Sequence, residues 1–555
     1  MVHDAAAGAP ARVLLVAADA GDAGLAEAFA DAGSMPVLAD LRERAAVVDT
    51  LAPRGLFVGA VWPTVMTGRD ADHHRYYTWL ALDEHGYGTH QTHPTEIDGE
   101  PFWTALDAAG RRCAVFDLPH TLAARTPPGF SGAVVSEWGC HDRHDGPASY
   151  PPGLLTELEA AAGGRHFGAG EPPGFDQFAP CDYLHRAGPH RRDDEAEALL
   201  ADLLTGHARK RAASLALLDR GGWDLFVTVL GESHCVGHQL WAVHDEHHPR
   251  HDPALRHRLG DPVEAVYAAI DRTLGDHLAR ADPDVAVYVL LSHGMGPHYD
   301  GTHLLDHLLL RIAQGAGGAQ PTGWRTRLAA TAVDHAPAVV GDRLGVVAAP
   351  VLRRRIAAAP PGPPDPPVDP EGLLELDRST RAWFVIPNNT VAGAIRINLA
   401  GREPAGVVDP AAYDEVCDLL TSRLAEVVDV DSGRRLVRQV VRVDHAMRRR
   451  DGDGLPDLLV EWDRTSLVER VWSPHVGTLV VPYTHWRTGD HHRGGRLYVV
   501  GPGIEPGRRR GPVSLAHLAP TVAAALGVPL AGVDGRPLPD LVPDPIPRAG
   551  AMVAS

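Results

Sequence analysis

The amino-acid sequence predicts an α/β fold with a mostly parallel central sheet, and two recurring patterns support this prediction. The first is a set of short, unbroken apolar runs, including RVLLVAADA, WDLFVTVLG and DVAVYVLLSHG, which end in glycine, proline or polar residues. Such runs are typical of strands that are buried on both faces. The second is the helical segments between them, such as DPVEAVYAAIDRTLGDHLARA. In folds of this kind, functional groups gather at the carboxyl ends of the strands.

The expected elements follow one another along the chain. RVLLVAADA predicts the first strand and GDAGLAEAFADAG the helix after it, while RRCAVFDLP and GRLYVVGPGI predict further strands. RRRIAAAPPGPPDPPVDP is too rich in proline for a helix or a central strand. Beyond it, AGAIRINLAGREPAGVV predicts a hairpin and DPAAYDEVCDLLTSRLAEVV a helix. The expected organisation is a main α/β domain at 1–350 with a cap-like insertion at about 136–192, a proline-rich linker at 351–370, a smaller α+β lobe at 371–470, a return to the main sheet at 471–540 and a flexible tail at 541–555.

Composition and charge favour a globular enzyme with a small-molecule substrate. Apolar residues make up 44% of the 555 residues and charged residues 22%, which is ordinary for a globular protein. The formal charge of −19 argues against nucleic acid or an anionic membrane as a partner. No apolar stretch approaches the roughly 18 residues of a membrane span. We expect a small anionic substrate at a locally positive site, and the sequence leaves the oligomeric state open.

Cysteine usage and the N-terminal segment favour a cytoplasmic protein. The cysteines are odd in number and show no CxxC spacing, so we expect neither a disulfide framework nor a zinc–thiolate site. MVHDAAAGAPARVLLVAADA lacks the basic segment and long apolar core of a signal peptide. The five cysteines are Cys113, Cys140, Cys181, Cys235 and Cys417.

The segment ESHCVGHQLW carries two histidines four residues apart, His234 and His238, directly after an apolar run. On a helix, this spacing places both imidazoles on one face, where they can hold one metal ion. The alternative is a pair of surface or supporting histidines at the start of a helix, which is common for an isolated HxxxH in a chain with 32 histidines. The position after a strand favours the metal site.

Other polar residues have the same placement at the edges of expected strands. Asp19 ends the first strand, Ser292 and His293 end VAVYVLL, and His491 and His492 precede GRLYVV. Each has an ordinary alternative explanation; Asp19, for example, is well placed to cap the following helix. Together they predict one cluster at the carboxyl edge of the sheet.

Several of these segments resemble one family in the same order along the chain. RVLLVAADAGDAG is similar to its opening metal–aspartate segment, AVWPTVMTGRDADHH to the segment after its nucleophile, and VLLSHGMGP to its SDHGMG segment. ESHCVGH resembles its E-x-D-x-x-x-H segment and GDHHRGGRLYVV its closing metal–histidine segment. The family is the alkaline phosphatase superfamily, in its type I phosphodiesterase/nucleotide pyrophosphatase-like branch. The resemblance implies an alkaline-phosphatase-like three-layer sandwich with cap insertions.

The resemblance also implies which residues hold metal. The family binds two divalent cations, usually zinc, beside a Thr or Ser nucleophile. Carried over to this sequence, Asp19 matches the first aspartate, and His238 and His293 match family histidines. His491 matches the last histidine better than His492, because it keeps the spacing of four residues to Gly495.

The sequence departs from the family pattern at three positions. His234 and Ser292 each stand where the family has a metal aspartate. The nucleophile position, four residues before Trp62, falls on Val58, which cannot attack a substrate. Thr64 is a nearby hydroxyl that we keep as a candidate catalytic residue, although the resemblance places it beyond the nucleophile.

These departures predict one altered metal site and one weakened site. His234, His238 and His491 would form a three-His site, which suits zinc and also iron or copper. The second site would keep Asp19, His293 and at best the Ser292 hydroxyl, so it would bind a cation weakly or not at all. A histidine in place of a lost ligand favours a metal site that is retained in altered form.

Additional polar residues are candidates for the surrounding pocket. Asp300 and His303, in GPHYDGTHLLD, are candidates for substrate binding or acid–base catalysis. Glu232 is a candidate for orienting a ligand histidine, and His74 for supporting the site. The alternative for each is an ordinary surface-loop residue.

Three functional hypotheses remain open from the sequence. The first is a metal-dependent hydrolase or transferase for a phosphate or sulfate mono- or diester, in which metal-bound water replaces the missing nucleophile. The second is an iron or copper enzyme with non-hydrolytic chemistry at the three-His site. The third is an inactive pseudoenzyme that binds a phosphorylated ligand. The sequence does not identify the substrate or the metal.

Overall fold

The structure is a computed structural model that divides the chain into two compact units. The first unit is built from the chain up to Tyr77, from His93 to Pro297, and from His485 onward; the second comprises Thr78–Thr92 and His298–Thr484. The expected linker at 351–370, about half of the expected insertion at 136–192 and most of the tail at 541–555 lie outside the described residues. The residues that the structure describes are 12–55, 57–83, 85–140, 143–164, 193–317, 377–388, 391–446, 454–483, 485 and 487–544.

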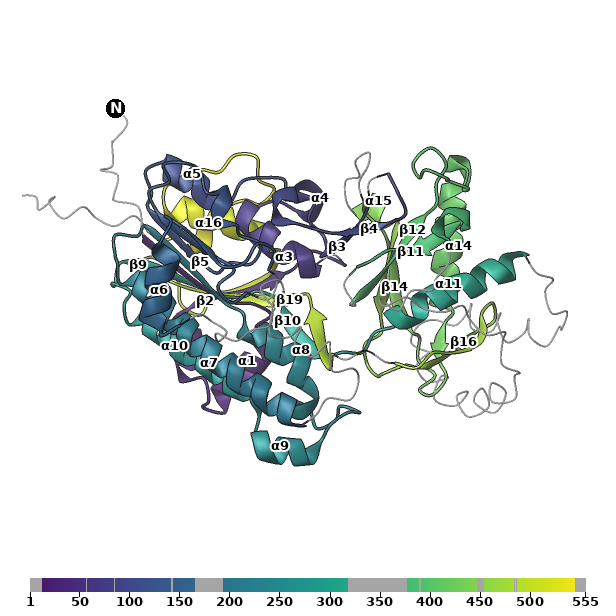
Figure 1. The fold of residues 1–555 in the computed structure, drawn as a ribbon, viewed down its shortest axis with the longest axis horizontal. Helices are drawn as coiled ribbons and strands as arrows, with labels where there is room; N and C mark the ends of the chain where they lie inside the picture. Colours follow the sequence, from purple (N-terminus) through teal and green to yellow (C-terminus); the bar gives the residue numbers. More distant parts are fainter. Residues whose placement is uncertain are drawn as a thin grey trace, which may run out of the picture. The chain divides into compact units, whose positions relative to one another are not determined.

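A nine-stranded sheet forms the centre of the first unit, and its strands are mostly parallel, as the sequence predicts (Figure 1). Parallel pairs join β1 to β8 and β9, β5 to β6 and β8, and β2 to β20. β19 runs antiparallel to both of its neighbours, as does β7 to β6. In spatial order the strands are β20 (Arg509–Ser514), β2 (Ala46–Leu51), β19 (Gly494–Val500), β9 (Val285–Leu291), β1 (Arg12–Ala18), β8 (Leu225–Leu230), β5 (Cys113–Phe116), β6 (Ala133–Ser136) and β7 (Ala148–Tyr150).

Helices cover both faces of this sheet. Figure 1 shows α3, α5 and α16 on one face and α1, α7 and α10 on the other, which gives three layers. The central strands have apolar residues on both sides because both faces are covered; every residue of β8 is buried. The helices of this unit are α1 (Ala23–Asp31), α2 (Pro36–Arg44), α3 (Phe57–Thr67), α4 (Ala71–His74), α5 (Phe102–Ala108), α6 (Leu154–Ala162), α7 (Asp193–Leu218), α8 (Glu232–His244), α9 (Pro253–Leu259), α10 (Pro262–Leu278) and α16 (Leu518–Ala525).

The backbone takes an unusual conformation just beyond the carboxyl ends of three strands. Ala20 follows β1, Asp117 follows β5 and Glu137 follows β6, with φ angles of 49°, 57° and 54°. Residues other than glycine rarely adopt positive φ, and such residues cluster at functional sites. The same edge of the sheet is where the sequence predicts the functional cluster.

The second unit is a smaller α+β lobe. It contains a four-stranded antiparallel sheet in the order β11-β12-β15-β14, and α11 and α14 contribute to its core. It includes 78–92 and 298–317, which the sequence analysis had assigned to the main domain. The elements of the lobe are β3 (Leu80–Leu82), β4 (Thr89–Gln91), α11 (Thr302–Gly317), β11 (Trp383–Val385), β12 (Ala392–Ile397), α14 (Tyr413–Ala425), β13 (Val428–Asp429), β14 (Val437–Arg442), α15 (Val443–Ala446), β15 (Leu458–Trp462), β16 (Arg470–Ser473) and β17 (Gly477–Val480).

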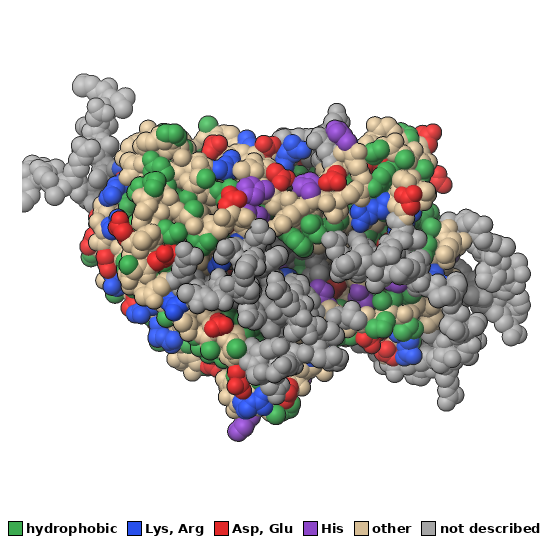
Figure 2. Space-filling view, in the orientation of Figure 1, with side chains coloured by type: hydrophobic (Ala, Val, Ile, Leu, Met, Phe, Trp, Pro, Cys, Tyr) green, Lys and Arg blue, Asp and Glu red, His purple; other side chains and the backbone are tan. Residues whose placement is uncertain are grey.

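Three further features concern the surface charges, the helices and the cysteines of the described residues. On the visible face of Figure 2, acidic and basic side chains are interspersed. None of the helices in the described ranges is long and apolar enough to cross a membrane. The four described cysteines are buried and form no disulfide with one another.

A buried ion cluster lies where α7, α8 and the end of β5 meet. The Lys210 ammonium lies 2.8 Å from an Asp117 carboxylate oxygen and 3.3 Å from a Glu232 oxygen, and all three side chains are at most 1% exposed. The other oxygen of Glu232 is 3.1 Å from His207 Nδ1. The two carboxylates raise the pKa of Lys210 although its burial alone would lower it, so the ammonium remains charged. The cluster fixes the first residue of α8.

Lys210→Met should lower the free energy of unfolding by about 3–5 kcal/mol, because it leaves two buried carboxylates without their cation. Urea denaturation followed by circular dichroism would measure the loss. Arg44→Met is the matched control: the Arg44–Asp40 pair is largely exposed, so its removal should cost less than about 1 kcal/mol. Equal stability of the two variants would contradict a structural role for the buried cluster.

Candidate metal centre

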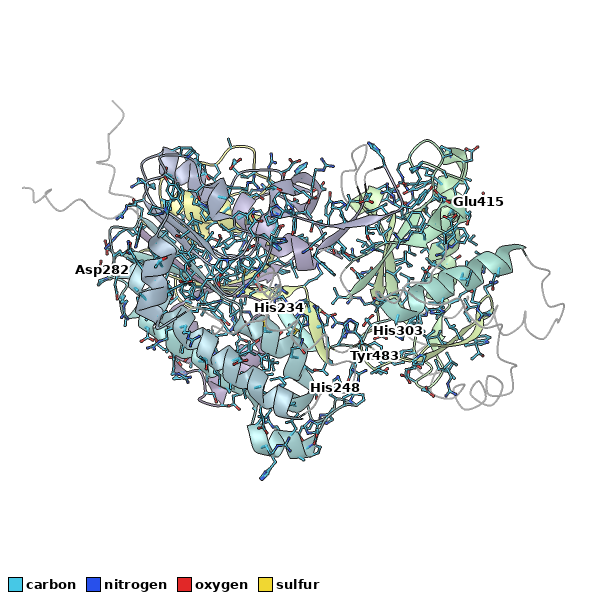
Figure 3. All side chains as sticks on the ribbon, viewed as in Figure 1. His234, His248, Asp282, His303, Glu415 and Tyr483 are labelled. Atoms are coloured by element: carbon cyan, nitrogen blue, oxygen red, sulfur yellow. The ribbon has the colours of Figure 1, made fainter. Side chains whose placement is uncertain are left out.

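Three buried histidines from two segments come together in the first unit. His234 and His238 lie on α8, and His491 lies on β18 (Gly489–His492). Their possible ligand nitrogens all lie within 4.8 Å of one another. The ring centroids of His234 and His238 are each within 4.7 Å of that of His491. Figure 3 labels His234 on this unit.

The position of α8 follows from local sequence signals. Gly231 separates β8 from α8, and the HxxxH spacing then places His234 and His238 one turn apart on one face. Ser233 anchors the start of the helix to the end of β1 by donating its hydroxyl to the Asp19 carbonyl at 2.6 Å. The two imidazoles therefore lie at the carboxyl edge of the sheet.

Asp19 contacts His234 through its carboxylate. His234 Nδ1 lies 2.7 Å from one oxygen, and the Trp62 indole donates to the other at 2.8 Å. Burial alone would raise the pKa of Asp19, but His234, His293 and Trp62 outweigh burial and hold that pKa below its usual range. An ionised carboxylate at Nδ1 leaves Nε2 as the ligand nitrogen of His234, as in many carboxylate–histidine–metal arrangements. The sequence analysis had assigned Asp19 to the second metal site.

His238 is oriented by a backbone carbonyl. Its Nδ1 donates to Gly489 O at 2.8 Å, so its Nε2 is the nitrogen that faces His491 Nε2, at 2.9 Å. Burial lowers the pKa of His238 well below its ordinary value, and Arg487 adds to the effect. The imidazole is therefore neutral, which is the form that binds metals.

The contact between α8 and β18 requires a glycine at position 489. A Cβ atom on Gly489 would lie 2.2 Å from the carbonyl oxygen of Gly237, which is shorter than any real contact of this kind. The neighbouring Thr488 amide donates to His238 O at 2.8 Å. β18 also pairs with β10 (Gly294–Pro297), which follows directly after His293. These contacts bring His491 to the helix.

His293 and Ser292 lie behind His491. His293 Nε2 is 3.1 Å from His491 Nδ1, and the Ser292 hydroxyl is 3.0 Å from His293 Nδ1. The hydroxyl also accepts from the Ala20 amide at 3.1 Å. Burial lowers the pKa of His293 to about 4. His293 therefore contacts the three-His cluster through His491, on the side away from His238, and Ser292 contacts His293.

His492 and its neighbour His491 contact different groups. Its Nε2 lies 2.7 Å from an oxygen of Asp22, and its side chain is 49% exposed. Adjacent residues of a strand point to opposite faces, so β18 can direct only one of the two imidazoles to His234 and His238. That residue is His491.

The donor set of the centre fits a divalent cation such as zinc. Zinc in catalytic sites is bound by three protein ligands, and three imidazoles are one of the common sets. Asp19 and the Gly489 carbonyl hold the Nδ1 atoms of His234 and His238, so both rings present Nε2. Among the described residues, His234, His238 and His491 are the group of three whose ligand atoms converge.

The hydroxyl of Thr64 lacks the arrangement of an activated nucleophile. Thr64 is fully buried in α3, with Oγ1 3.0 Å from His74 Nε2. The Tyr76 amide donates to His74 Nδ1 at 3.2 Å, so Nε2 carries the proton and donates to Thr64. Burial lowers the pKa of His74 to about 3. A nucleophile needs a base that accepts its proton, and His74 in this tautomer does not accept one. Val58 lies in the first turn of the same helix.

Asp300 and His303 belong to the second unit, where they surround a tyrosine. Tyr483 Oη lies 2.7 Å from His298 Nδ1 and 3.1 Å from an Asp300 oxygen. The His303 ring is 4.9 Å from the Tyr483 ring between centroids, and Figure 3 labels both residues. The sequence did not point to Tyr483, because it lies in no recognisable motif and about 180 residues from Asp300 and His303 in the chain.

Glu232 and Arg487 have contacts that the sequence did not predict. Glu232 contacts Lys210 and His207, and the carboxylate that contacts His234 Nδ1 is that of Asp19. Arg487, which the sequence analysis did not identify, places Nη1 3.5 Å from His238 Nε2. Its spacing of four residues before His491 is the one signal that could have drawn attention to it.

Comparison with solved structures gives distant matches. Murine ectonucleotide pyrophosphatase/phosphodiesterase 5, as an inactive variant in complex with AMP, aligns with 95% of this chain and 97% of that chain, at a TM-score of 0.46 and 10% identity. The same murine protein in another structure aligns with 94% and 97% of the two chains, at a TM-score of 0.45 and 11% identity. No curated protein sequence matches the chain.

The family model for type I phosphodiesterase/nucleotide pyrophosphatase matches residues 13–492. This range begins in β1 and ends at the last residue of β18, so it includes Asp19, α8, His293 and His491. The chain therefore belongs to the type I phosphodiesterase/nucleotide pyrophosphatase family.

Proposed function

We propose that the protein is a metal-dependent hydrolase or transferase that acts on a phosphate or sulfate mono- or diester at the three-His centre. The observation that carries this proposal is the convergence of the ligand nitrogens of His234, His238 and His491 within 4.8 Å, in a buried position. Membership of a phosphodiesterase family supports the ester class of substrate. We propose a small anionic molecule as the substrate.

Zinc is the first candidate for the metal. Neutral imidazoles suit zinc, iron and copper alike, and a three-imidazole set with an open position is typical of catalytic zinc. A divalent cation bound there would polarise the ester and lower the pKa of a coordinated water. The protein holds His234 through Asp19 and His238 through Gly489 O, so both rings are oriented before a metal arrives.

Water is the proposed nucleophile. The position that the family uses for Thr or Ser is Val58, which has no hydroxyl. The buried Thr64 hydroxyl accepts from His74 rather than donating to it. Direct attack by water needs neither side chain, and the protein's part is to hold the ester next to the three-His centre and to exclude bulk solvent.

The second candidate function is a binding protein for an anionic ligand without turnover. Val58 favours this candidate, because the covalent route of the family has lost its nucleophile. A non-hydrolytic iron or copper enzyme is the third, and the identity of the bound metal separates it from the first.

Purified protein should contain about one zinc per chain, held by the three histidines. Elemental analysis by inductively coupled plasma mass spectrometry would measure the metal, and His238→Ala should lose it. His247→Ala is the matched control, since it removes an imidazole whose side chain is 95% exposed and which is not one of the three histidines. Iron or copper in place of zinc would favour the non-hydrolytic candidate. Absence of bound metal from the wild-type protein, even after incubation with zinc, would refute the metal-dependent function.

Thr64→Val should retain ester hydrolysis, whereas His238→Ala should abolish it. Valine has the shape of threonine without its hydroxyl, so the substitution removes one possible nucleophile and also the acceptor of the buried His74 hydrogen bond. The assay would follow chromogenic phosphate diesters, phosphate monoesters and sulfate esters at a temperature where circular dichroism shows both variants folded. Loss of activity in Thr64→Val, together with a phosphorylated Thr64 detected by mass spectrometry, would contradict attack by water. No turnover of any ester by zinc-loaded wild-type protein would favour the binding protein.

A further inference from the structure

A cationic side chain lies beside the three-His centre. Arg487 Nη1 is 3.5 Å from Nε2 of His238, the nitrogen that remains after Nδ1 binds Gly489 O. The guanidinium contributes to the low pKa of His238, second to burial. Arginine keeps its charge throughout the physiological pH range. The centre therefore contains a fixed positive charge in addition to its neutral imidazoles.

Backbone contacts determine where Arg487 lies. The next residue, Thr488, donates its amide to His238 O at 2.8 Å, and its hydroxyl accepts from the Ala242 amide at 3.2 Å. The residue after that is Gly489, which touches α8 directly. On the other side, the Arg487 amide donates to His485 Nδ1 at 3.3 Å. The contacts of His485, Thr488 and Gly489 thus position the guanidinium at the centre.

A guanidinium in this position has opposite effects on cations and anions. It repels a divalent cation bound by His238, and solvent screens this repulsion only in part, because His238 is buried and Arg487 is half-buried. It attracts an oxyanion, and its planar fork suits two oxygens of a phosphoryl or sulfuryl group. An oxyanion beside the cation would experience attraction from both positive groups and would offset their mutual repulsion.

We propose that Arg487 is an oxyanion-binding residue of the three-His centre and that it makes divalent cation and oxyanion bind cooperatively. The proposal rests on the proposed function in one respect, namely that the three histidines bind a divalent cation. It adds that the phosphoryl or sulfuryl oxygens of the substrate lie against the Arg487 guanidinium. Because coupling between two bound ligands is reciprocal, the anion strengthens cation binding by the same factor as the cation strengthens anion binding.

The test measures zinc affinity with and without sulfate as the oxyanion. Metal-free protein competes with a chromophoric chelator for zinc, at constant ionic strength set with sodium chloride. Sulfate should tighten zinc binding to the wild-type protein by about tenfold, within the usual range for coupled sites. Arg487→Gln removes the charge, so it should bind zinc more tightly than wild type without sulfate and should show no sulfate effect. Arg487→Lys keeps the charge and should retain most of the coupling.

Arg250→Gln is the matched control for disturbance of the segment. Arg250 donates to the carbonyl oxygen of His485, two residues before Arg487 in the chain, so its replacement disturbs the same part of the chain without removing the Arg487 guanidinium. It should leave the sulfate effect as in wild type. A purely structural role for Arg487 predicts weaker zinc binding in Arg487→Gln, and that result, or an unchanged sulfate effect, would overturn the proposal.

This measurement also separates the inference from the proposed function. Zinc binding that is coupled to sulfate through Arg487, in a protein that turns over no ester, would support the inference and reject the hydrolase. Ester hydrolysis with full zinc affinity and no dependence on Arg487 would support the hydrolase and reject the inference.

Discussion

The close approach of α8 and β18 is the constraint on which the three-His centre depends. Gly489 lies against Gly237 O at a distance that excludes any side chain at 489. This contact lets the Gly489 carbonyl accept from His238 and the Thr488 amide donate to the His238 carbonyl. It brings His491 of β18 next to His238 of α8, although the two residues are about 250 positions apart in the sequence. Without that glycine, His491 could not reach the two histidines of α8, and the three imidazoles would belong to separate surfaces.

Because position 234 is a histidine, the Asp19 carboxylate contacts an imidazole. In the family pattern that the sequence resembles, an acidic residue stands at 234 and Asp19 is a metal ligand. Here the Asp19 carboxylate lies 2.7 Å from His234 Nδ1 and accepts from Trp62 through its other oxygen. An acid that orients an imidazole makes that imidazole a stronger donor. If the three imidazoles hold a metal as proposed, the negative charge of Asp19 lies behind the ligands rather than among them.

Much of the fold and part of the centre follow from local sequence patterns. The strand-length apolar runs predicted the parallel sheet, and the HxxxH after WDLFVTVLG predicted two imidazoles on one helical face at a strand end. The hydrogen-bond partners of buried polar groups could not be predicted from the sequence, because they depend on contacts between segments that are distant in the chain. Glu232 binds Lys210 and His207, and the His74 tautomer is fixed by the Tyr76 amide. Arg487 belongs to no motif, and its place at His238 depends on the path of the segment before β18.

The left-handed residues at the strand ends have a consequence for the evolution of this edge of the sheet. Ala20 has a φ of 49°, although alanine gains nothing from that region, and its amide donates to Ser292. Holding an alanine there costs about 1 kcal/mol or more, so the native state stores strain next to the residues that contact His491. Glycine would relieve this strain, and larger side chains are disfavoured because Ala20 is fully buried. The geometry of the centre is therefore protected by a backbone that most substitutions would destabilise.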